Sequence, residues 1–227
     1  MTSERPPRRN ARVAEIPTTD RARPTNIVIK QKRFDGGYFD KWYRHPQHRV
    51  GTTADLKRLI GFALAATEYV LAHPVRSVLD VGAGEGRWQP VIRNLRPSAR
   101  YQGVDPSEYA VRRFGTRRNI VRGTVDDLPQ LLPDRSFDLV VCCSVINYLP
   151  RDVMIRAIRN IADRTAGLAY LEIFASEDEV EGDTTGWHAE SRASYLRIIR
   201  DAGLVPCGLH CYIPCSNAST LVGLERA

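Results

Sequence analysis

Hydrophobic and polar positions divide the chain into a polar start, a helical segment and a long stretch of alternating strands and helices. Residues 1–26 hold four prolines and many arginines but no aromatic side chain, so this stretch cannot bury enough apolar surface to order itself. Five aromatic residues, beginning with Phe34, then fall within ten positions. Phe34, Tyr38 and Trp42 are spaced four apart, which predicts that they share one face of a helix.

A second helix is predicted to begin at Thr53, because Thr52 and Asp55 form a helix N-terminus signal and the following apolar residues recur with helical spacing as far as Pro74. Beyond Pro74, short apolar runs alternate with amphipathic segments. The expected strands lie at 75–81, 101–104, 120–122, 137–144 and 168–174, and the expected helices at 86–95, 108–114, 152–164 and 192–202. Two last strands, at about 205–213 and 219–225, have no helix between them and are expected to pair as a hairpin joined by residues 214–217.

Strands that alternate with helices form a mainly parallel sheet with helices on both faces. We therefore predict an α/β fold, a three-layer sandwich around a seven-stranded, mostly parallel sheet with an antiparallel C-terminal hairpin. The predicted organisation is a disordered basic arm over 1–33, N-terminal lid or cap helices over 34–75, and a core domain over 76–227. The length of 227 residues agrees with one domain and an appendage.

The formal net charge of +7 is unevenly distributed. Residues 1–33 hold nine basic and three acidic side chains, whereas the remainder is nearly neutral. A nucleic-acid partner is therefore not expected, except through the arm. The five cysteines are an odd number, which indicates reduced thiols and a cytoplasmic protein. No window approaches about 18 uncharged apolar residues, so no membrane span is expected.

The loop after the first strand carries the clearest chemical signal. Gly82, Gly84 and Gly86 are spaced G-x-G-x-G between an apolar strand and a helix. Glycines allow a tight turn and close approach of a ligand, and the helix N-terminus beyond supplies free N–H groups. Arg87 stands where the dinucleotide fingerprint would have its third glycine. Asp80 lies just inside the strand.

These residues resemble the first motif of the class I S-adenosylmethionine-dependent methyltransferases, a Rossmann-like family. The resemblance covers roughly residues 76–227 and implies S-adenosylmethionine as the cofactor, with Asp80, Gly82, Gly84 and Gly86 beside it. No metal is expected, because the spacing of Cys207, Cys211 and Cys215 matches no zinc motif.

Further segments resemble the family in the same order along the chain. Asp105, at the end of the second strand, matches the acidic residue that accepts hydrogen bonds from the ribose hydroxyls. The segment 123–129 is similar to the adenine-binding segment, where the Val125 N–H would reach the ring and Asp126 would accept from the amine. Many relatives carry an aspartate where this chain has Thr124, which leaves open which side chain reads the amine. Cys143 lies near the end of the fourth strand, and in the family the end of this strand faces the methionine portion of the cofactor.

The aromatic segment before the core has two interpretations. It is either a helix packed on the core or a lid over the cofactor. Similar family members close their site with a helix that carries Tyr and Arg. By that comparison Tyr38, Arg44 and Arg49 are candidates to meet the methionine carboxylate of the cofactor, the arginines through a bidentate fork. Tyr38 is also a candidate to contact the sulfonium centre.

The acceptor site is expected beyond the ends of strands four and five. Methyl transfer requires the acceptor to be held in line, and it requires a base only when the acceptor is protonated or a hydroxyl. Tyr148, Glu172 and His188 are the candidate catalytic residues, and Asn147 and Trp187 the candidate substrate-binding residues. Each is also explained by a capping or core role. The acidic run 177–183 is either a solvated loop or an acidic mouth that attracts a cationic amine.

The sequence thus predicts a methyltransferase that modifies a small molecule at an amine or hydroxyl. The motif of amino-directed nucleic-acid methyltransferases is missing after strand four, and so is the paired-glutamate loop of protein arginine methyltransferases. Two alternatives stay open: an RNA- or ribosome-associated methyltransferase that uses the arm, and a non-catalytic cofactor-binding subunit. The oligomeric state is not predicted.

Overall fold

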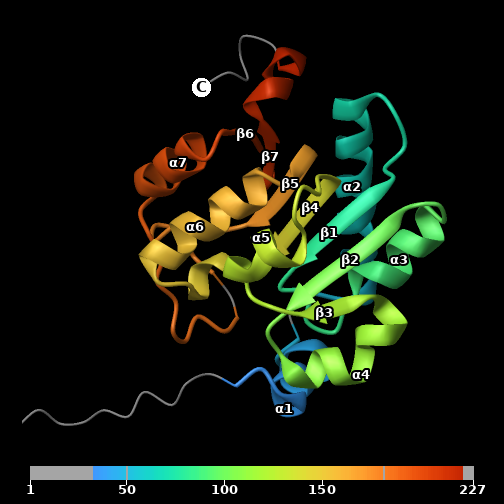
Figure 1. Ribbon diagram of the computed structural model, residues 1–227. Helices are drawn as coiled ribbons and strands as arrows, with labels where there is room; N and C mark the ends of the chain where they lie inside the picture. The colour runs from blue at the N-terminus through green and yellow to red at the C-terminus, as the bar shows by residue number, and fades with distance from the viewer. Residues whose placement is uncertain (1–32, 50, 181, 222–227) are drawn as a thin grey trace, which may run out of the picture. The chain divides into compact units, whose positions relative to one another are not determined.

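The computed structural model describes residues 33–49, 51–180 and 182–221, and it confirms the predicted α/β sandwich (Figure 1). Nearly all of the predicted basic arm lies outside these residues. The strands run in the order β3-β2-β1-β4-β5-β7-β6. The pairings among β1 to β5 are parallel, whereas β7 is antiparallel to both β5 and β6. The strands are β1 Ser77–Val81, β2 Arg100–Asp105, β3 Ile120–Arg122, β4 Phe137–Cys143, β5 Thr165–Glu172, β6 Leu204–Gly208 and β7 Cys211–Pro214.

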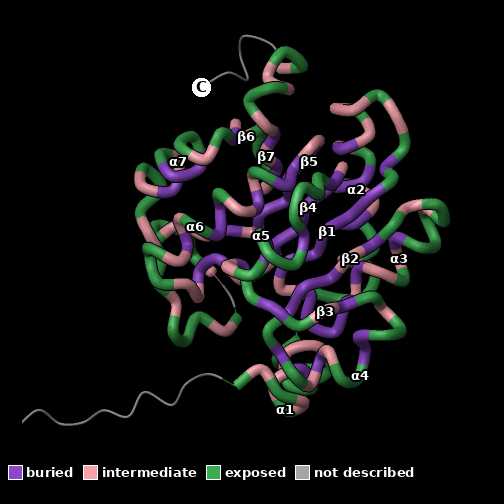
Figure 2. The backbone as a smooth tube through the Cα atoms, viewed as in Figure 1, coloured by how far each residue is buried: buried purple, intermediate pink, exposed green. Residues whose placement is uncertain are grey.

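Helices cover both faces of this sheet. Helices α2 and α3 pack against one face and α6 and α7 against the other, and the buried positions concentrate along the central strands (Figure 2). No helix within the described ranges is long and apolar enough to cross a membrane. The helices are α1 Gly36–Phe39, α2 Thr53–Leu71, α3 Trp88–Leu95, α4 Glu108–Arg118, α5 Leu128–Leu131, α6 Arg151–Ala162 and α7 Arg192–Asp201.

Helix α2 begins and ends where its sequence signals predict. The Asp55 backbone N–H donates to Thr52 Oγ1 at 3.1 Å, and the Thr52 N–H donates to the Asp55 carboxylate at 2.8 Å. This reciprocal capping box satisfies two donors at the helix start. The helix closes at Ala72, which adopts a left-handed φ of 55°, two residues before Pro74.

The aromatic segment is less regular than predicted. Phe34 and Tyr38 do meet, with ring centroids 5.0 Å apart, but Trp42 instead contacts the His48 ring at 6.0 Å. The reason is that Asp40–Arg44 forms a π-helical turn, whose wider spacing moves Trp42 off the predicted face.

The position predicted for the C-terminal hairpin was wrong. The chain turns back at Leu209 and His210, which have φ of 50° and 62°, so that β6 and β7 divide the single strand expected over 205–213. Cys215–Thr220, expected to include the turn and the start of the last strand, is a 3₁₀ helix. A two-residue turn of this kind normally carries Asn or Gly, and neither residue marks it here. The rest of the expected strand, 222–225, lies outside the described residues.

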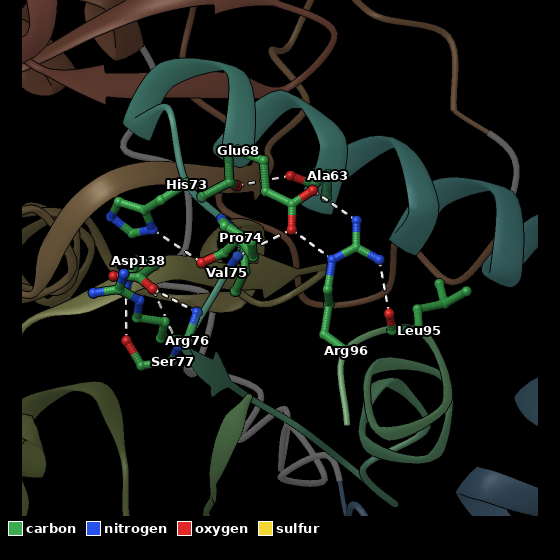
Figure 3. Close-up of polar contacts among 11 residues, drawn as sticks. Ala63, Glu68, His73, Pro74, Val75, Arg76, Ser77, Leu95, Arg96 and Asp138 are labelled. Atoms are coloured by element: carbon green, nitrogen blue, oxygen red, sulfur yellow. Dashed lines mark hydrogen bonds and ion pairs between the residues drawn. The ribbon is translucent and has the colours of Figure 1, made fainter. Parts of the chain in front are cut away.

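A polar clasp holds α2, α3 and the amino end of the sheet together (Figure 3). Glu68 of α2 accepts two hydrogen bonds from Arg96, at 2.5 and 2.6 Å, and a third from the Val75 backbone N–H at 3.0 Å. On the neighbouring strand, Asp138 accepts from the backbone N–H groups of Arg76 and Ser77. These bonds fix the entry into β1, from which the glycine loop leaves at the other end.

Replacing Glu68 with alanine is expected to lower the free energy of unfolding by about 2 kcal/mol, because three hydrogen bonds, two of them to a guanidinium, are lost together. Arg96 holds the pKa of the Glu68 carboxyl below its usual range. A carboxyl whose pKa is lower in the folded state than in the unfolded state stabilises the fold at pH values above its unfolded-state pKa. This contribution is lost as the pH falls. Urea unfolding should therefore show the difference from wild type at pH 7 and its disappearance below about pH 4. Glu179→Ala, in an exposed loop, is the control. An equal loss of unfolding free energy in Glu179→Ala would refute a stabilising role of the clasp.

Candidate active site

The glycine loop leaves β1 with a backbone that only glycine adopts easily. Gly82, Gly84 and Gly86 have φ of 72°, 54° and 68°, in the left-handed region that disfavours other residues. The N–H groups of Gly82 and Ala83 donate to the Val104 carbonyl, which ties the loop to β2. A Cβ on Gly82 would lie 2.2 Å from Val145 Cγ2. The three glycine positions thus present backbone without side chains, and the loop packs closely against the segment after β4.

Asp105, the last residue of β2, holds the glycine loop in place through hydrogen bonds to the backbone. Its two carboxylate oxygens accept hydrogen bonds from the backbone N–H groups of Gly84, at 2.6 Å, and Ser107, at 2.8 Å. The residue is 6% exposed, and burial raises the pKa of its carboxyl. A carboxylate can accept about four hydrogen bonds. Asp105 therefore keeps capacity for two hydroxyls, as the ribose prediction requires.

Asp80 lies beneath the loop in a wholly buried position. The Tyr101 hydroxyl donates to its Oδ2 at 2.6 Å. Burial raises the pKa of Asp80 to about 7, although the bond from Tyr101 acts in the opposite direction. Asp80 is therefore a buried carboxyl at the end of β1 that holds its proton more tightly than an exposed one.

The segment predicted to bind adenine follows β3. Val125 and Asp126 lie in a 3₁₀ turn, Val125–Asp127, that begins with a capping box between Thr124 and Asp127. The Asp126 carboxylate pairs with Arg156 of α6 at 3.1 Å through both oxygens, so an adenine amine would have to compete with that pair. A pocket of about 410 Å³ adjoins Thr124, which is within the range of small-ligand sites.

Residues 34–44, here called the lid segment, cover the glycine loop. Arg44 forms a bidentate ion pair with Glu85 at 2.7 Å to each oxygen. Phe39 Cε1 and Tyr43 Oη lie 3.0 and 2.7 Å from the position that a Gly84 Cβ would take. Burial raises the pKa of Tyr43, and its ring lies 4.9 Å from the Arg87 guanidinium.

Of the three residues that the sequence proposed for the lid, Tyr38 and Arg49 are not among the described residues that contact the glycine loop. Tyr38 packs edge-on against Phe34 and Phe39 and hydrogen-bonds to the hydroxyl of Tyr148. Arg49 is exposed on the turn after the lid segment. Their contacts with a cofactor stay predictions. Phe39 and Tyr43, which pack at Gly84, were missed, because Tyr43 lies in the π-helical turn, which has no sequence signal, and Phe39 immediately precedes that turn.

The expected acceptor side contains a polar pair at the ends of β4 and β5. Cys143 is paired in register with Glu172. The next residue, Ser144, has a left-handed φ of 54° and donates from Oγ to the Glu172 carboxylate at 2.6 Å. Burial raises the pKa of the Cys143 thiol, so this residue offers an uncharged surface beside the pair. Ser144 is exposed and Glu172 partly exposed, which leaves both accessible.

The other candidates take mainly structural positions. Asn147 is fully buried and bonds both ways with the Phe174 backbone. The Tyr148 hydroxyl donates to the Asp183 carbonyl at 2.6 Å. The His188 side chain is exposed, while its backbone N–H donates to the Asn147 carbonyl. Trp187 stacks on Phe174 with ring centroids 5.8 Å apart. The structure thus brings Trp187 to the acceptor side, whereas His188 faces outward.

One residue that the sequence did not single out joins this group. His210, in the turn between β6 and β7, lies 5.9 Å from the Tyr170 ring and 5.6 Å from the Phe174 ring. Together with the lid segment it forms a continuous chain of ring contacts with centroid separations of 5.0 to 6.2 Å. In order, the rings are Tyr170, His210, Phe174, Trp187, Tyr148, Phe34, Tyr38 and Phe39. The lid and the acceptor side are therefore in physical contact.

The residues present fit the cofactor that the resemblance implies. An adenosine group needs a loop whose glycines allow close approach to the backbone, a carboxylate with unused acceptor capacity, and a pocket such as the one beside the Gly123–Thr124 turn. Gly82, Gly84, Gly86 and Asp105 would hold it. Bound there, S-adenosylmethionine supplies an activated methyl group on a sulfonium.

Comparisons with known proteins agree with this geometry. The family model described as "Methyltransferase domain" matches residues 47–213. Over 114 residues the chain is 32% identical to a demethylmenaquinone methyltransferase of Deinococcus radiodurans, a match that covers 48% of this chain and 42% of the relative. The chain thus aligns with less than half the length of that relative.

Solved structures show the same fold at low sequence identity. A magnesium protoporphyrin IX methyltransferase from Synechocystis PCC 6803 is 18% identical with a TM-score of 0.54, covering 75% of this chain and 86% of that one. A methyltransferase from Archaeoglobus fulgidus is 14% identical with a TM-score of 0.54, covering 74% and 72%. Because the family match covers most of its length, the chain belongs to the methyltransferase domain family and has the Rossmann-like fold of the S-adenosylmethionine-dependent methyltransferases.

Proposed function

We propose that this chain transfers a methyl group to a hydroxyl or amine of a small molecule at the edge formed by β4 and β5. The observation that carries the proposal is the Ser144–Glu172 pair, with 2.6 Å between its oxygens. Val145, the next residue, touches the glycine loop at Gly82. The polar pair and the cofactor loop are thus neighbours, as an in-line transfer requires.

A small acceptor is supported by the enclosure of this edge. Phe34 of the lid segment and Trp187 of the loop after β5 both contact the Tyr148 ring, which leaves less room for a macromolecule than an open groove would. The curated relative is named for a small-molecule acceptor, which agrees with this class.

The chain's own residues have distinct roles in this proposal. The glycine loop and Asp105 bind the cofactor. The lid segment excludes water, since Phe39 is 3% exposed and Arg44 fastens the segment to Glu85. Glu172 takes up or stabilises the proton that the acceptor releases. Ser144 holds the Glu172 carboxylate in place.

The test is release of S-adenosylhomocysteine from S-adenosylmethionine in the presence of a filtered extract of small metabolites. Wild-type protein should release it. Glu172→Gln should bind S-adenosylhomocysteine with unchanged affinity by calorimetry but lose about 100-fold or more in turnover, because acid–base catalysis contributes that much. Glu179→Gln, a nearby exposed carboxylate, should leave turnover unchanged.

Cofactor binding with no turnover on any extract would refute the proposal in favour of a non-catalytic subunit. Full activity of Glu172→Gln would refute the role of Glu172. Equal losses in Glu172→Gln and Glu179→Gln would indicate a general effect of acidic charge rather than a role of the pair.

A further inference from the structure

A second pocket is formed by the start of the lid segment, the amino end of α4 and the end of β3. Its volume is about 420 Å³, which is within the range of small-ligand sites. Three arginines line it, and they come from three separate parts of the chain: Arg33 just before the lid segment, Arg112 of α4 and Arg122 of β3. This site is called the arginine pocket below.

The three guanidiniums of the arginine pocket are available to a ligand. Within the part of the chain that the structure describes, no ion pair and no side-chain hydrogen bond engages Arg33, Arg112 or Arg122, and all three residues are exposed. A guanidinium presents five N–H donors and no acceptor. Positive charges gathered in one concave site raise the local concentration of anions, so the chemistry of the pocket favours an anionic ligand.

The acidic residues of the pocket do not cancel this charge. Asp35 and Glu108 also line it, so the lining holds three positive and two negative side chains. Asp35 Oδ1 accepts from the backbone N–H of Tyr38 at 3.1 Å and thereby caps α1. The remainder of α4 adds three more arginines and no acidic residue. The surroundings of the pocket are therefore basic.

Neither the cofactor nor the proposed acceptor accounts for these arginines. The adenosine group, which fits the pocket beside Thr124, carries no negative charge. The two pockets share Pro106 and Arg122 in their linings, so their ligands would be neighbours. The acceptor edge is formed by β4 and β5, whereas the arginine pocket lies at β2 and β3, on the other side of β1 (Figure 1). The arginines thus face a third ligand.

The arginine pocket also adjoins the beginning of the lid segment. There the Ser107 hydroxyl donates to the Phe34 carbonyl at 2.6 Å, which is a single hydrogen bond to a neutral acceptor. At the other end of the lid segment, Arg44 is held by its bidentate ion pair. An anion that bridges Arg33 and Arg112 would fasten the beginning of the lid to α4 in a comparable way.

We propose that the arginine pocket binds the phosphate group of a small ligand that is neither the cofactor nor the methyl acceptor, and that this ligand tightens cofactor binding by fastening the lid. A phosphate group presents three acceptor oxygens and close to two negative charges, so it can serve three guanidiniums at once, whereas a carboxylate has two oxygens. By linkage, the cofactor tightens the binding of this ligand by the same factor. The inference does not depend on the chemistry of the acceptor.

The test uses the full chain with inorganic pyrophosphate as the probe and calorimetry as the measurement. Wild type should bind pyrophosphate, and saturating pyrophosphate should tighten the binding of S-adenosylhomocysteine by about 5-fold or more. Arg112→Gln should weaken pyrophosphate binding by about 10-fold or more, because a hydrogen bond between charged groups is lost. It should also abolish the tightening, while its affinity for S-adenosylhomocysteine alone stays at the wild-type value.

Arg113→Gln is the matched control. Arg113 is the next residue of α4 and carries the same charge, but its guanidinium lies against the rings of Tyr109 and Phe114 and it is not part of the pocket lining. This variant should keep both pyrophosphate binding and the tightening. Both variants retain the basic N-terminal arm, so binding of pyrophosphate by the arm cannot produce a difference between them.

Four outcomes would contradict the proposal. Absence of pyrophosphate binding by folded wild type, or equal losses in Arg112→Gln and Arg113→Gln, overturns the pocket as an anion site. Weaker binding of S-adenosylhomocysteine in the presence of pyrophosphate assigns the arginines to the cofactor and overturns a separate ligand. Pyrophosphate binding that leaves this affinity unchanged overturns the coupling through the lid. A polyuridylate oligomer that binds more tightly than pyrophosphate, and equally well to both variants, indicates a nucleic-acid surface and overturns the small ligand.

Discussion

Replacing Gly82 with alanine should abolish cofactor binding and lower the free energy of unfolding by about 3 kcal/mol or more. Two effects add. Gly82 has a φ of 72°, which costs an L-residue roughly 1–2 kcal/mol. The new Cβ would also lie 2.2 Å from Val145 Cγ2, so the loop or the segment after β4 must move. Overpacking of this kind costs about 1–3 kcal/mol.

Two comparison variants make this result specific. Gly61 of α2 is helical, and a Cβ added there would meet no atom within 4 Å, so Gly61→Ala should leave binding intact and stabilise the protein by about 0.5–1 kcal/mol. Gly82→Ala combined with Val145→Ala removes the clash but not the strain, and should recover only part of the stability. Calorimetry with S-adenosylhomocysteine and urea unfolding measure both quantities. Wild-type affinity in Gly82→Ala would contradict the loop's role.

The geometry of the glycine loop and of Asp105 could be predicted from the sequence because its signals are local. The spacing of Gly82, Gly84 and Gly86 follows from the turn that the backbone makes between β1 and α3, and Asp105 follows directly from the end of β2. Elements that depend on hydrophobic period were also predictable, including the capped start of α2 at Thr52.

The acceptor side was less predictable because its geometry depends on tertiary contacts. Leu209 and His210 form a turn without any residue that favours one, since β7 is held by β5 rather than by its own turn. Tyr43 reaches the glycine loop only through a π-helical turn anchored by the Arg44–Glu85 pair, 41 positions apart. Neither feature leaves a pattern in the sequence.

Replacing Asp105 with asparagine is expected to weaken binding of S-adenosylhomocysteine by about 100-fold or more. The carboxylate accepts from two backbone N–H groups, at 2.6 and 2.8 Å. An asparagine amide has only one acceptor oxygen, so its NH₂ group would face the other N–H donor and that hydrogen bond would be lost. One loop contact and one contact to the ribose are then lost, and hydrogen bonds to charged groups contribute about 1.5–3 kcal/mol each. The matched control is Asp134→Asn, an exposed residue with φ of 51° that asparagine tolerates.

The stability of Asp105→Asn should have the opposite pH dependence to that of Glu68→Ala. Burial raises the pKa of the Asp105 carboxyl above its usual value. Between the usual and the raised pKa the folded state binds more protons than the unfolded state, so this group makes wild type less stable as pH rises. Asparagine carries no such charge. Any loss of unfolding free energy in Asp105→Asn should therefore be smaller at pH 8 than at pH 4, while binding stays weak at both.

A variant that binds S-adenosylhomocysteine within about threefold of wild type would exclude Asp105 as the ribose ligand, because the loss of even one hydrogen bond to a charged group exceeds that factor. A stability loss that grows with pH would show that its buried carboxylate stabilises the loop as an anion.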